Sequence, residues 1–526
     1  MINSASKTIK WALCAACIAL STSFLAVPAA LGAGDSPKAS RSAKKADAVT
    51  SSTDHKLPAG SPAPYGAIPT VRQVEWQRME CYAFIHFGLN TFTGREWGYG
   101  DEDPAAFNPK NFNADEIVKT LKAGGMKGMI YTAKHHDGWC AWPTKSTTHN
   151  ITKSKWKNGK GDVVREFADA CKKNDMKFGI YVSPWDRNHA EYAKPGYTAA
   201  YHKQIEELFT NYGDLFELWL DGANGGDGYY GGARETRKLS QNAGQYYDFP
   251  GIVKMARELQ PNASVWGVGN AGDVRWGGSE AGVVGYPHWP TIGGKEEHPA
   301  SCKEGCKWVT AAHGIEDGKF WVPAEADTCI NRAGWFWHKQ NNPKSPKELL
   351  DVWFKSVGRG ANLILNLGPN QDGKLDSGDV KALMGFKNLR DRLYSKDFAL
   401  GGKAVSKTSR GKKFSAQNLV DGDIDTFWTG KDDELTAEAV ITLPAPSTFD
   451  VVRLREEIRL GQRVKAWAID AKVNGAWKEV LVGSSVGNQA MLRLDAPVTT
   501  QEVRLRITKS AAVPCISELS LLRFPQ

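Results

Sequence analysis

The stretch Phe178-Gly179-Ile180-Tyr181-Val182 is an apolar run, followed by a helical pattern over residues 197–212 and a second apolar run, Phe216-Glu217-Leu218-Trp219-Leu220. Near-continuous apolar runs of this length are typical of strands that are buried on both faces of a parallel sheet. The order strand, helix, strand therefore predicts one repeating unit of an α/β fold.

The same alternation extends from about residue 75 to residue 395. A helix is expected over residues 114–123, which Gly124-Gly125 ends, and another over residues 162–174 with Asp162 as N-cap. Alternation over this length predicts a (β/α)8-type barrel, although no apolar run marks its sixth strand. The other expected strands are 82–86, 128–132, 264–267, 320–323 and 362–366, and the other expected helices are 248–259 and 346–357.

The pattern changes after about residue 400, where helical periodicity stops and short strands with alternating apolar residues begin. Turns such as Asn474-Gly475 separate these strands. We therefore predict a catalytic barrel over residues 65–398 and a β-sandwich over residues 399–526. The expected sandwich strands include 439–443, 451–454, 466–470 and 503–507.

The N-terminus has the composition of a secretory signal peptide over residues 1–33. Lys7 and Lys10 precede an apolar segment, and small residues follow it at 29–33. Residues 34–64 are rich in Ser, Ala, Lys and Pro, which predicts a flexible tether. We expect a secreted or periplasmic protein with no membrane span in the mature chain. A retained anchor is the alternative, and attachment to the cell surface stays open.

Composition excludes several classes of protein. The chain has 526 residues, of which 41% are hydrophobic and 24% charged, which is typical of a globular protein. The formal net charge is +9, and no Lys/Arg-rich block lies inside the folded region, so no nucleic-acid partner is expected. Nineteen Trp residues suit the apolar faces of sugar rings, although core packing also uses Trp. Cys302 and Cys306 are the one pair of cysteines expected to be able to form a disulfide.

Polar and aromatic residues follow the expected strands in the same relative position. His86 ends the first strand, Lys134-His135-His136-Asp137-Gly138 follows the second, Ser183-Pro184-Trp185-Asp186 the third and Asp221-Gly222 the fourth. In a (β/α)8 barrel the active site lies at the C-terminal ends of the strands. Four such clusters in register predict a single pocket there.

Two carboxyl groups in this region suit glycoside hydrolysis, which needs one ionised and one protonated carboxyl on the same bond. Asp221 ends the apolar fourth strand, although an Asp-Gly pair also forms turns. Glu280 lies in a loop rich in Gly and Trp after the expected fifth strand, and a solvated surface glutamate is the alternative. Glu325, at the end of the expected seventh strand, is a rival for the role of acid.

Neither a metal nor a cofactor is expected. His135 and His136 are adjacent, and neighbouring residues on a strand point to opposite faces, so we assign them to substrate hydroxyls. Residues 267–272 fit G-x-G-x-x-G, but no helix is expected to begin there, as dinucleotide binding requires. Residues 421–425 contain alternating acids but lack EF-hand spacing, and we predict a turn.

At these positions the sequence resembles the family 29 glycoside hydrolases, the retaining α-L-fucosidases. The combination of motifs, in chain order, makes the resemblance specific. The matching stretches are Phe84-Ile85-His86-Phe87-Gly88, Glu96-Trp97, Lys134-His135-His136-Asp137-Gly138-Trp139, Tyr181-Val182-Ser183-Pro184-Trp185, Leu218-Trp219-Leu220-Asp221-Gly222 and Gly360-Ala361-Asn362-Leu363-Ile364-Leu365-Asn366-Leu367-Gly368-Pro369.

The resemblance implies Asp221 as the nucleophile. Residues 273–282 resemble the subfamily that prefers α-1,3/1,4-linked fucose. In that subfamily the Glu of this stretch is the acid/base, so the resemblance implies this role for Glu280. It implies that Trp335 and Trp337 stack on the sugar, with ordinary packing as the alternative. It places Arg275 near the acid/base loop. The residues expected to bind substrate are His86, Glu96, Trp97, His135, His136, Tyr181, Trp185, Arg275 and Trp335.

The resulting hypothesis is a retaining exo-glycosidase that removes terminal α-L-fucosyl residues from oligosaccharides or glycoconjugates and needs no cofactor. Two alternatives stay open: another retaining exo-glycosidase such as an α-galactosidase, and a fucose-binding lectin-like protein without activity. The C-terminal domain resembles discoidin-type carbohydrate-binding modules, and a structural role is as consistent with its sequence as sugar binding. The natural glycan and the oligomeric state are not predicted.

Overall fold

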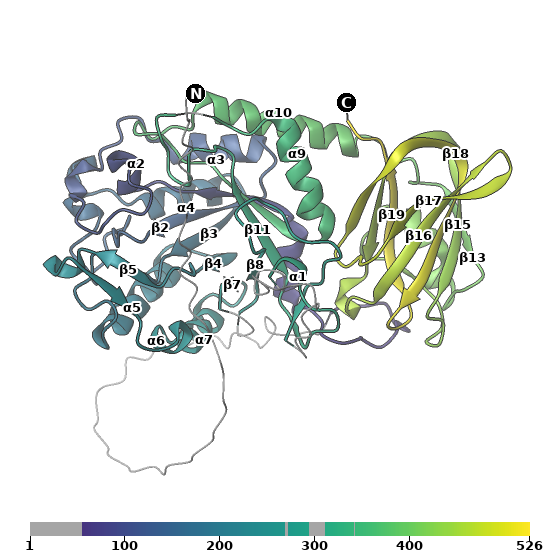
Figure 1. The fold of residues 1–526 in the computed structure, drawn as a ribbon, viewed down its shortest axis with the longest axis horizontal. Coiled ribbons are helices and arrows are strands. Elements are labelled where there is room, and N and C mark those ends of the chain that lie inside the picture. Colours follow the sequence, from purple (N-terminus) through teal and green to yellow (C-terminus); the bar gives the residue numbers. More distant parts are fainter. Residues whose placement is uncertain (1–54, 269–271, 294–310, 341, 526) are drawn as a thin grey trace, which may run out of the picture.

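The computed structural model describes residues 55–268, 272–293, 311–340 and 342–525. The expected signal peptide, Cys302 and Cys306 lie outside these residues. Within them, no helix combines the length and the apolar character that crossing a membrane would require. The described chain forms a barrel with surrounding helices and a separate lobe of antiparallel strands (Figure 1).

Eight parallel strands form the barrel, which confirms the predicted fold class. Hydrogen bonds join them in the order β7-β4-β3-β2-β1-β12-β11-β8, and a parallel bridge between Trp266 and Val274 joins the two ends of this sheet. The strands are β1 (Cys81–Ile85), β2 (Gly128–Lys134), β3 (Lys177–Val182), β4 (Glu217–Trp219), β7 (Ser264–Trp266), β8 (Arg275–Trp276), β11 (Ala324–Cys329) and β12 (Asn362–Asn366).

The sixth and seventh strands differ from the prediction. The sixth is the two-residue β8, in the segment that we assigned to a loop, and the seventh is β11 rather than residues 320–323. Phe320–Trp321 (β10) instead pairs antiparallel with Thr291–Ile292 (β9). The sequence of β11 alternates alanines with Glu325 and Asp327, so it contains no apolar run that would reveal a strand.

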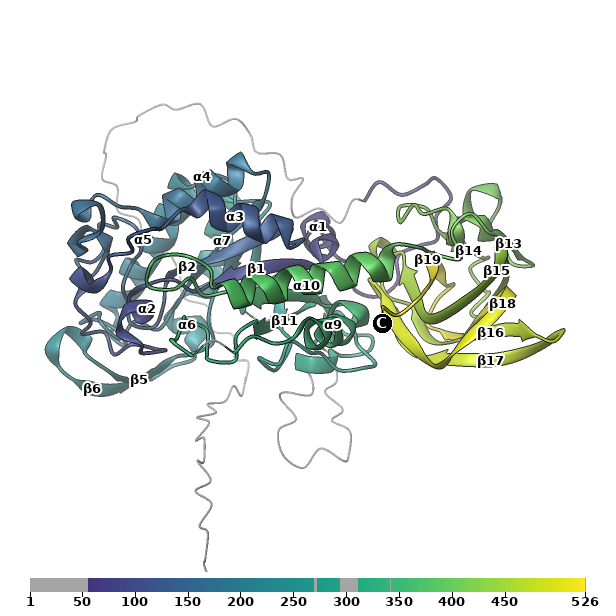
Figure 2. The same ribbon diagram turned by 90° about the horizontal axis from the view of Figure 1, so that it is seen from above.

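The predicted helices are confirmed with end shifts of one or two residues. Asp162 caps α4 by accepting from the Arg165 N–H, as expected. The helices α1 (Val71–Met79) and α10 (Ser377–Tyr394) were not predicted, and α10 runs along the barrel towards the C-terminal lobe (Figure 2). The confirmed helices are α3 (Ala114–Ala123), α4 (Val163–Lys173), α5 (Gly196–Asn211), α7 (Phe249–Leu259) and α9 (Pro346–Lys355).

The inside of the barrel is filled mainly by aromatic side chains. Trp219 and Trp266 stack with ring centroids 3.6 Å apart, and Tyr181 stacks on Trp219 at 5.2 Å. Trp76, from α1, belongs to the same buried cluster. The interior is therefore a packed core on which the strand ends are fixed.

The C-terminal lobe is an antiparallel sheet whose long strands bend, as β15 (Ala437–Glu456) does at a register shift between Thr442 and Ser447. Its order is β14-β19-β15-β18-β16-β17, and β13 pairs with β15. Asn474 and Gly475 both have positive φ and form the predicted turn. The other strands are β13 (Lys403–Ser406), β14 (Trp428–Thr429), β16 (Val464–Val473), β17 (Ala476–Gly483), β18 (Ala490–Ser510) and β19 (Cys515–Leu522).

Candidate active site

Asp221 lies two residues after β4, at the mouth of the barrel. The Tyr181 hydroxyl donates to its Oδ2 at 3.0 Å, and the Ala223 N–H donates to its Oδ1 at 2.7 Å. The second bond is the local turn that an Asp-Gly pair favours, and the first aims the carboxylate towards the barrel. One oxygen therefore forms the local turn, and the other is held by Tyr181 at the mouth of the barrel.

Three histidines surround the position next to Asp221. His86 shares a hydrogen bond with Asn366 Oδ1 through Nδ1 at 2.8 Å, and His136 does so with Ser183 Oγ at 2.7 Å. Burial lowers the pKa of His86 to about 3 and that of His136 to about 4, and the charge of Asp221 opposes the second shift. These rings are neutral at physiological pH, so they can exchange hydrogen bonds with sugar hydroxyls without repelling a positive transition state.

His135 and His136 converge on the site although they are adjacent in the chain. Their ring centroids lie 4.1 Å apart, because β2 ends at Lys134 and both residues belong to the following loop. The His135 ring also stacks on Tyr181 at 5.7 Å. Among the described residues, no group of three or more His, Cys, Asp or Glu side chains has the arrangement of a metal site.

Glu96 and Trp97 come from the loop that follows β1. The Glu96 Oε1 accepts from the Trp335 and Phe336 N–H groups, and its Oε2 lies 2.7 Å from His338 Nε2. Trp97 is 52% exposed at the rim of the site. Glu96 thus holds the Trp335 loop in place, while Trp97 offers an open aromatic face to a ligand.

Trp335 and Trp185 form walls of the site. The Trp335 ring lies 5.1 Å from His86, and its side chain lies beside the Glu280 carboxyl, whose pKa it lowers. The buried Trp185 ring lies 5.2 Å from His136 and 5.8 Å from Trp97, and its own indole donates to Tyr230. Together with Tyr181, these rings give the site the flat apolar surfaces that sugar rings require.

Glu280 follows β8, so it comes after the sixth strand of the barrel rather than the fifth as predicted. The residue is exposed to solvent. Partial burial raises the pKa of Glu280, the hydrogen bond from Trp335 lowers it, and the charges of Asp221 and Glu96 raise it further. Glu280 therefore lies within electrostatic range of Asp221 and holds its proton to a higher pH than an ordinary glutamic acid.

Arg275 does not join the site. It lies between Val274, just before β8, and Trp276, which both belong to the inner cluster of the barrel, so its own side chain points outwards. The guanidinium donates to the backbone carbonyls of Ala311, Val322 and Trp289. The prediction of Arg275 as a substrate-binding residue is therefore replaced by a structural role in the segments packed outside the barrel.

Two further expected residues also lie elsewhere. Trp337 donates its indole N–H to Asp376 Oδ2 at 2.7 Å, in agreement with the packing alternative. Glu325 is the second residue of β11 rather than its end, and it is fully buried inside the barrel. Glu325 is therefore in the wrong place to act as the general acid at the mouth of the barrel, the role for which it was the alternative to Glu280.

Residues that the sequence pattern did not single out complete the site. Asn366, at the end of β12, contacts His86 and donates to the Trp335 carbonyl at 2.7 Å. The rule applied to the first four strands would have found it, because it too is the last residue of a strand. Asp327 accepts from the Trp276 indole at 2.7 Å, and Phe336 packs against His86 and His135.

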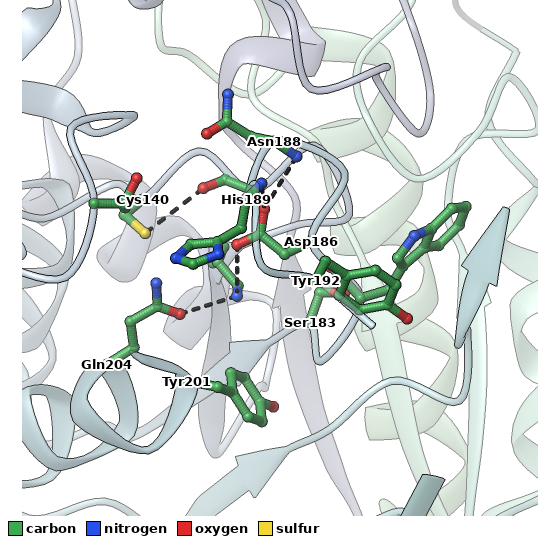
Figure 3. A network of polar contacts seen from close by, with 12 residues as sticks. Cys140, Ser183, Asp186, Asn188, His189, Tyr192, Tyr201 and Gln204 are labelled. Carbon is green, nitrogen blue, oxygen red and sulfur yellow. Dashed lines mark hydrogen bonds and ion pairs between the residues drawn. The ribbon is translucent and has the colours of Figure 1, made fainter. Parts of the chain in front are cut away.

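A buried ion pair fixes the loops that carry His136 and Trp185. Lys134 Nζ lies 3.3 Å from Asp186 Oδ2 and donates to Gln204 at 2.9 Å and Tyr197 at 3.0 Å. Figure 3 shows Asp186 between the turn that carries Asn188 and His189 and the side of α5 that carries Gln204. This network joins the end of β2 to the loop after β3.

We expect Lys134→Met to destabilise the barrel by about 3–5 kcal/mol, because Asp186 would remain buried without its cation. Denaturant unfolding followed by Trp fluorescence would measure this loss. Lys387→Met is the control, since Lys387 pairs with Asp391 at the surface, and its expected effect is below about 1 kcal/mol. Equal effects of the two substitutions would contradict the structural role of the buried pair.

The described chain has a hollow of about 980 Å³ at the other end of the barrel. It is lined by residues at or before the starts of strands, including Lys177, Phe178 and Phe216. Active sites of this fold lie at the opposite end, where Asp221 and the histidines converge. The candidate site is therefore the mouth and not this hollow.

Comparisons with known proteins agree with this geometry. A family model described as Alpha-L-fucosidase matches residues 64–388, and one described as F5/8 type C domain matches residues 402–519. Alpha-L-fucosidase 1 of Arabidopsis thaliana is 35% identical over 474 residues, which are 88% of each chain.

Solved structures are similar over most of the chain. A glycoside hydrolase 29 family member from an unknown rumen bacterium is 39% identical with a TM-score of 0.77, covering 88% of this chain and 78% of that one. A Ruminococcus gnavus GH29 fucosidase in complex with fucose is 29% identical with a TM-score of 0.78, covering 90% and 98%. The chain therefore belongs to glycoside hydrolase family 29 and is an α-L-fucosidase with a C-terminal discoidin-like domain.

Proposed function

We propose that this fucosidase is a retaining exo-enzyme in which Asp221 attacks the anomeric carbon of a terminal α-L-fucosyl residue. The observation that carries the proposal is the carboxylate of Asp221 at the end of β4, held by the Tyr181 hydroxyl at 3.0 Å. Attack forms the bond from Asp221 to the sugar and breaks the bond to the leaving oxygen. Water then hydrolyses this glycosyl-enzyme, and the two displacements retain the configuration.

Glu280 is proposed as the acid/base. The raised pKa of its carboxyl keeps a proton available for the leaving oxygen in the first step. After that transfer Glu280 is ionised and can take a proton from the attacking water in the second step. Since protons and charge balance within the two carboxyl groups and the substrate, this mechanism requires no cofactor.

The pocket residues are proposed to recognise fucose through neutral hydrogen-bonding groups and aromatic faces. His86, His135 and His136 supply the ring nitrogens, and Trp97 with Trp335 supplies the flat surfaces. The fucose complex of the similar Ruminococcus gnavus enzyme supports fucose as the sugar bound. Tyr181 and Trp185 also belong to the proposed pocket, and Glu96 shapes it by holding the Trp335 loop.

A preference for α-1,3/1,4-linked fucose on branched glycans is proposed from the resemblance of residues 273–282 to that subfamily. We expect release of fucose from a Lewis-type trisaccharide at a kcat/KM at least about tenfold above that for 2'-fucosyllactose. Chromatography of the products, with an aryl fucoside as a check of basic activity, measures the ratio. Equal cleavage of all three substrates would refute the preference without affecting the assignment of fucosidase activity.

Export through the N-terminal 33 residues is proposed from their composition. The mature enzyme would then act on glycans outside the cytoplasm, in the periplasm or beyond. Residues 55–64, the end of the expected tether, instead lie against the C-terminal lobe, where Arg410 donates to the Gly60 carbonyl at 2.8 Å and Arg463 to the Ala63 carbonyl at 2.6 Å. N-terminal sequencing of the protein recovered from its native cells tests this proposal. A mature chain that begins near residue 34 supports export, and an intact Met1 contradicts cleavage.

A further inference from the structure

Two buried glutamates face each other inside the barrel, below the site. Glu217 is the first residue of β4 and Glu325 the second of β11, and both are fully buried. Burying an ionised carboxylate is costly unless hydrogen bonds or opposite charges compensate. The proposed mechanism uses neither residue, so their presence in an aromatic core requires another explanation.

The hydrogen bonds of the pair require a proton between the two carboxyl groups. Glu325 accepts from the Trp219 indole at 2.6 Å with one oxygen and from the Tyr82 hydroxyl with the other. Glu217 accepts from the Trp76 indole with Oε2 at 2.7 Å, and its buried Oε1 has no donor among the described residues. The Glu325 carboxyl lies beside Glu217, and the Tyr82 hydroxyl faces both, so an ionised Glu217 would leave its Oε1 buried without a donor next to a second carboxylate.

Both oxygens of Glu325 receive a hydrogen bond from a donor, whereas Glu217 Oε1 receives none, so we place the proton on Glu217 Oε1. We propose that Glu217 donates this proton to Glu325, and that the pair is a positioning device that fixes Trp219 and, through it, Tyr181 and Asp221. Neither glutamate touches the substrate. The inference rests on Asp221 as the proposed nucleophile.

The connection from the pair to Asp221 runs through stacked rings. The Trp219 ring, held by Glu325, stacks between Trp266 at 3.6 Å and Tyr181 at 5.2 Å. Tyr181 in turn donates to Asp221. Without its acceptor, the Trp219 indole would have to leave a buried N–H unsatisfied or rotate, and rotation would displace Tyr181.

The surroundings of the pair agree with a proton on Glu217. Burial raises the pKa of both carboxyls, and the charge of Glu325 raises that of Glu217 further. The groups that face the pair are Trp76 from α1, Tyr82 from β1, Trp219 from β4 and Asp327 from β11, and none of these is a cation.

Two isosteric substitutions distinguish the two glutamates. Glu217→Gln replaces the proposed O–H donor with an N–H donor, so we expect kcat within about threefold of the wild type. Glu325→Gln leaves one oxygen to accept from both Trp219 and Tyr82 and turns an N–H towards a donor. We expect its kcat for an aryl fucoside to fall by about tenfold or more, with a smaller change in KM.

Two readouts do not depend on activity. Near-UV circular dichroism reports the stacked indoles of Trp219 and Trp266. We expect this signal to be kept in Glu217→Gln and changed in Glu325→Gln.

The second readout is the pH dependence of stability. A group whose pKa is raised by folding loses its stabilising effect as the pH rises above its unfolded pKa. Because Glu217→Gln removes such a group, its Tm should fall less than that of the wild type as the pH rises above the ordinary pKa of a glutamic acid, 4.5.

Glu456→Gln is the matched control, since Glu456 is a buried carboxyl in the C-terminal lobe that accepts from backbone N–H groups of Arg463, Val464 and Gly487. It should leave kcat and the indole signal unchanged. The proposal would be overturned if Glu217→Gln and Glu325→Gln behaved alike, whether both were active, inactive or unfolded. It would also be overturned if Glu217→Gln lost more activity than Glu325→Gln. If Asp221 were not the nucleophile, the dichroism and the Tm would still show the asymmetry.

Discussion

Asp221→Ala is expected to lower kcat for an aryl fucoside by about 10³-fold or more, because the glycosyl-enzyme cannot form without the carboxylate. Folding should be preserved, since Asp221 lies at the barrel mouth and its contacts there are one tyrosine hydroxyl and one local turn. Initial rates and a thermal unfolding curve of the same preparation measure both quantities. The loss should appear in kcat rather than in KM alone.

Asp214→Ala is the control for this experiment, because Asp214 is an exposed aspartate in the loop before β4. Azide gives a second check, since it fits the space left by a carboxylate and can attack the anomeric carbon as the aryl group leaves. The product would be a fucosyl azide of inverted configuration. Hydrolysis at a rate close to that of the wild type would remove Asp221 from the mechanism.

Glu280→Ala should have the second largest effect, and its size should depend on the leaving group. An aryl oxygen with a low pKa leaves without protonation, whereas a sugar oxygen requires it. We expect kcat/KM for a fucosylated oligosaccharide to fall by about 10²-fold or more and that for an activated aryl fucoside by about tenfold or less. Parallel measurements with the two substrates give the ratio.

The pH dependence of the same variant gives an independent test of Glu280. An acid must be protonated to donate, so activity falls as the pH rises above its pKa. Because its surroundings raise the pKa of Glu280, this alkaline fall should begin at a higher pH than for an ordinary glutamic acid, and it should vanish in Glu280→Ala. Glu258→Ala, on the exposed face of α7, is the control. An unchanged alkaline limb would assign the acid to another residue.

Much of the barrel was predictable because most of its strands are buried on both faces. The runs that became β1, β2, β3, β4 and β12 are mostly apolar, and the helices between them have clear caps such as Asp162. The sixth and seventh strands were missed for a physical reason. β8 has only two residues, and β11 carries two carboxyl side chains that the interior satisfies with Trp and Tyr donors.

The site was predictable where a residue lies within two positions of the end of a strand, as Asp221, His86 and the His135-His136 pair do. The site was not predictable where the direction of a side chain decides whether the residue reaches the mouth of the barrel. Arg275 lies on the outward face of β8. Which residues of β8 point outwards depends on where this strand begins, and no apolar run in the sequence marks it. Glu325 looked like a residue of the mouth because the strand that contains it was placed four residues too early.

The most direct test of the account is to trap the covalent intermediate with a 2-deoxy-2-fluoro-L-fucosyl fluoride. The fluorine at C2 slows both steps, and the fluoride leaving group allows the first to proceed, so a fucosyl ester accumulates. Peptide mapping by mass spectrometry should place the added sugar on Asp221. An adduct on Glu280 or any other residue, or inhibition without a covalent adduct, would contradict the mechanism.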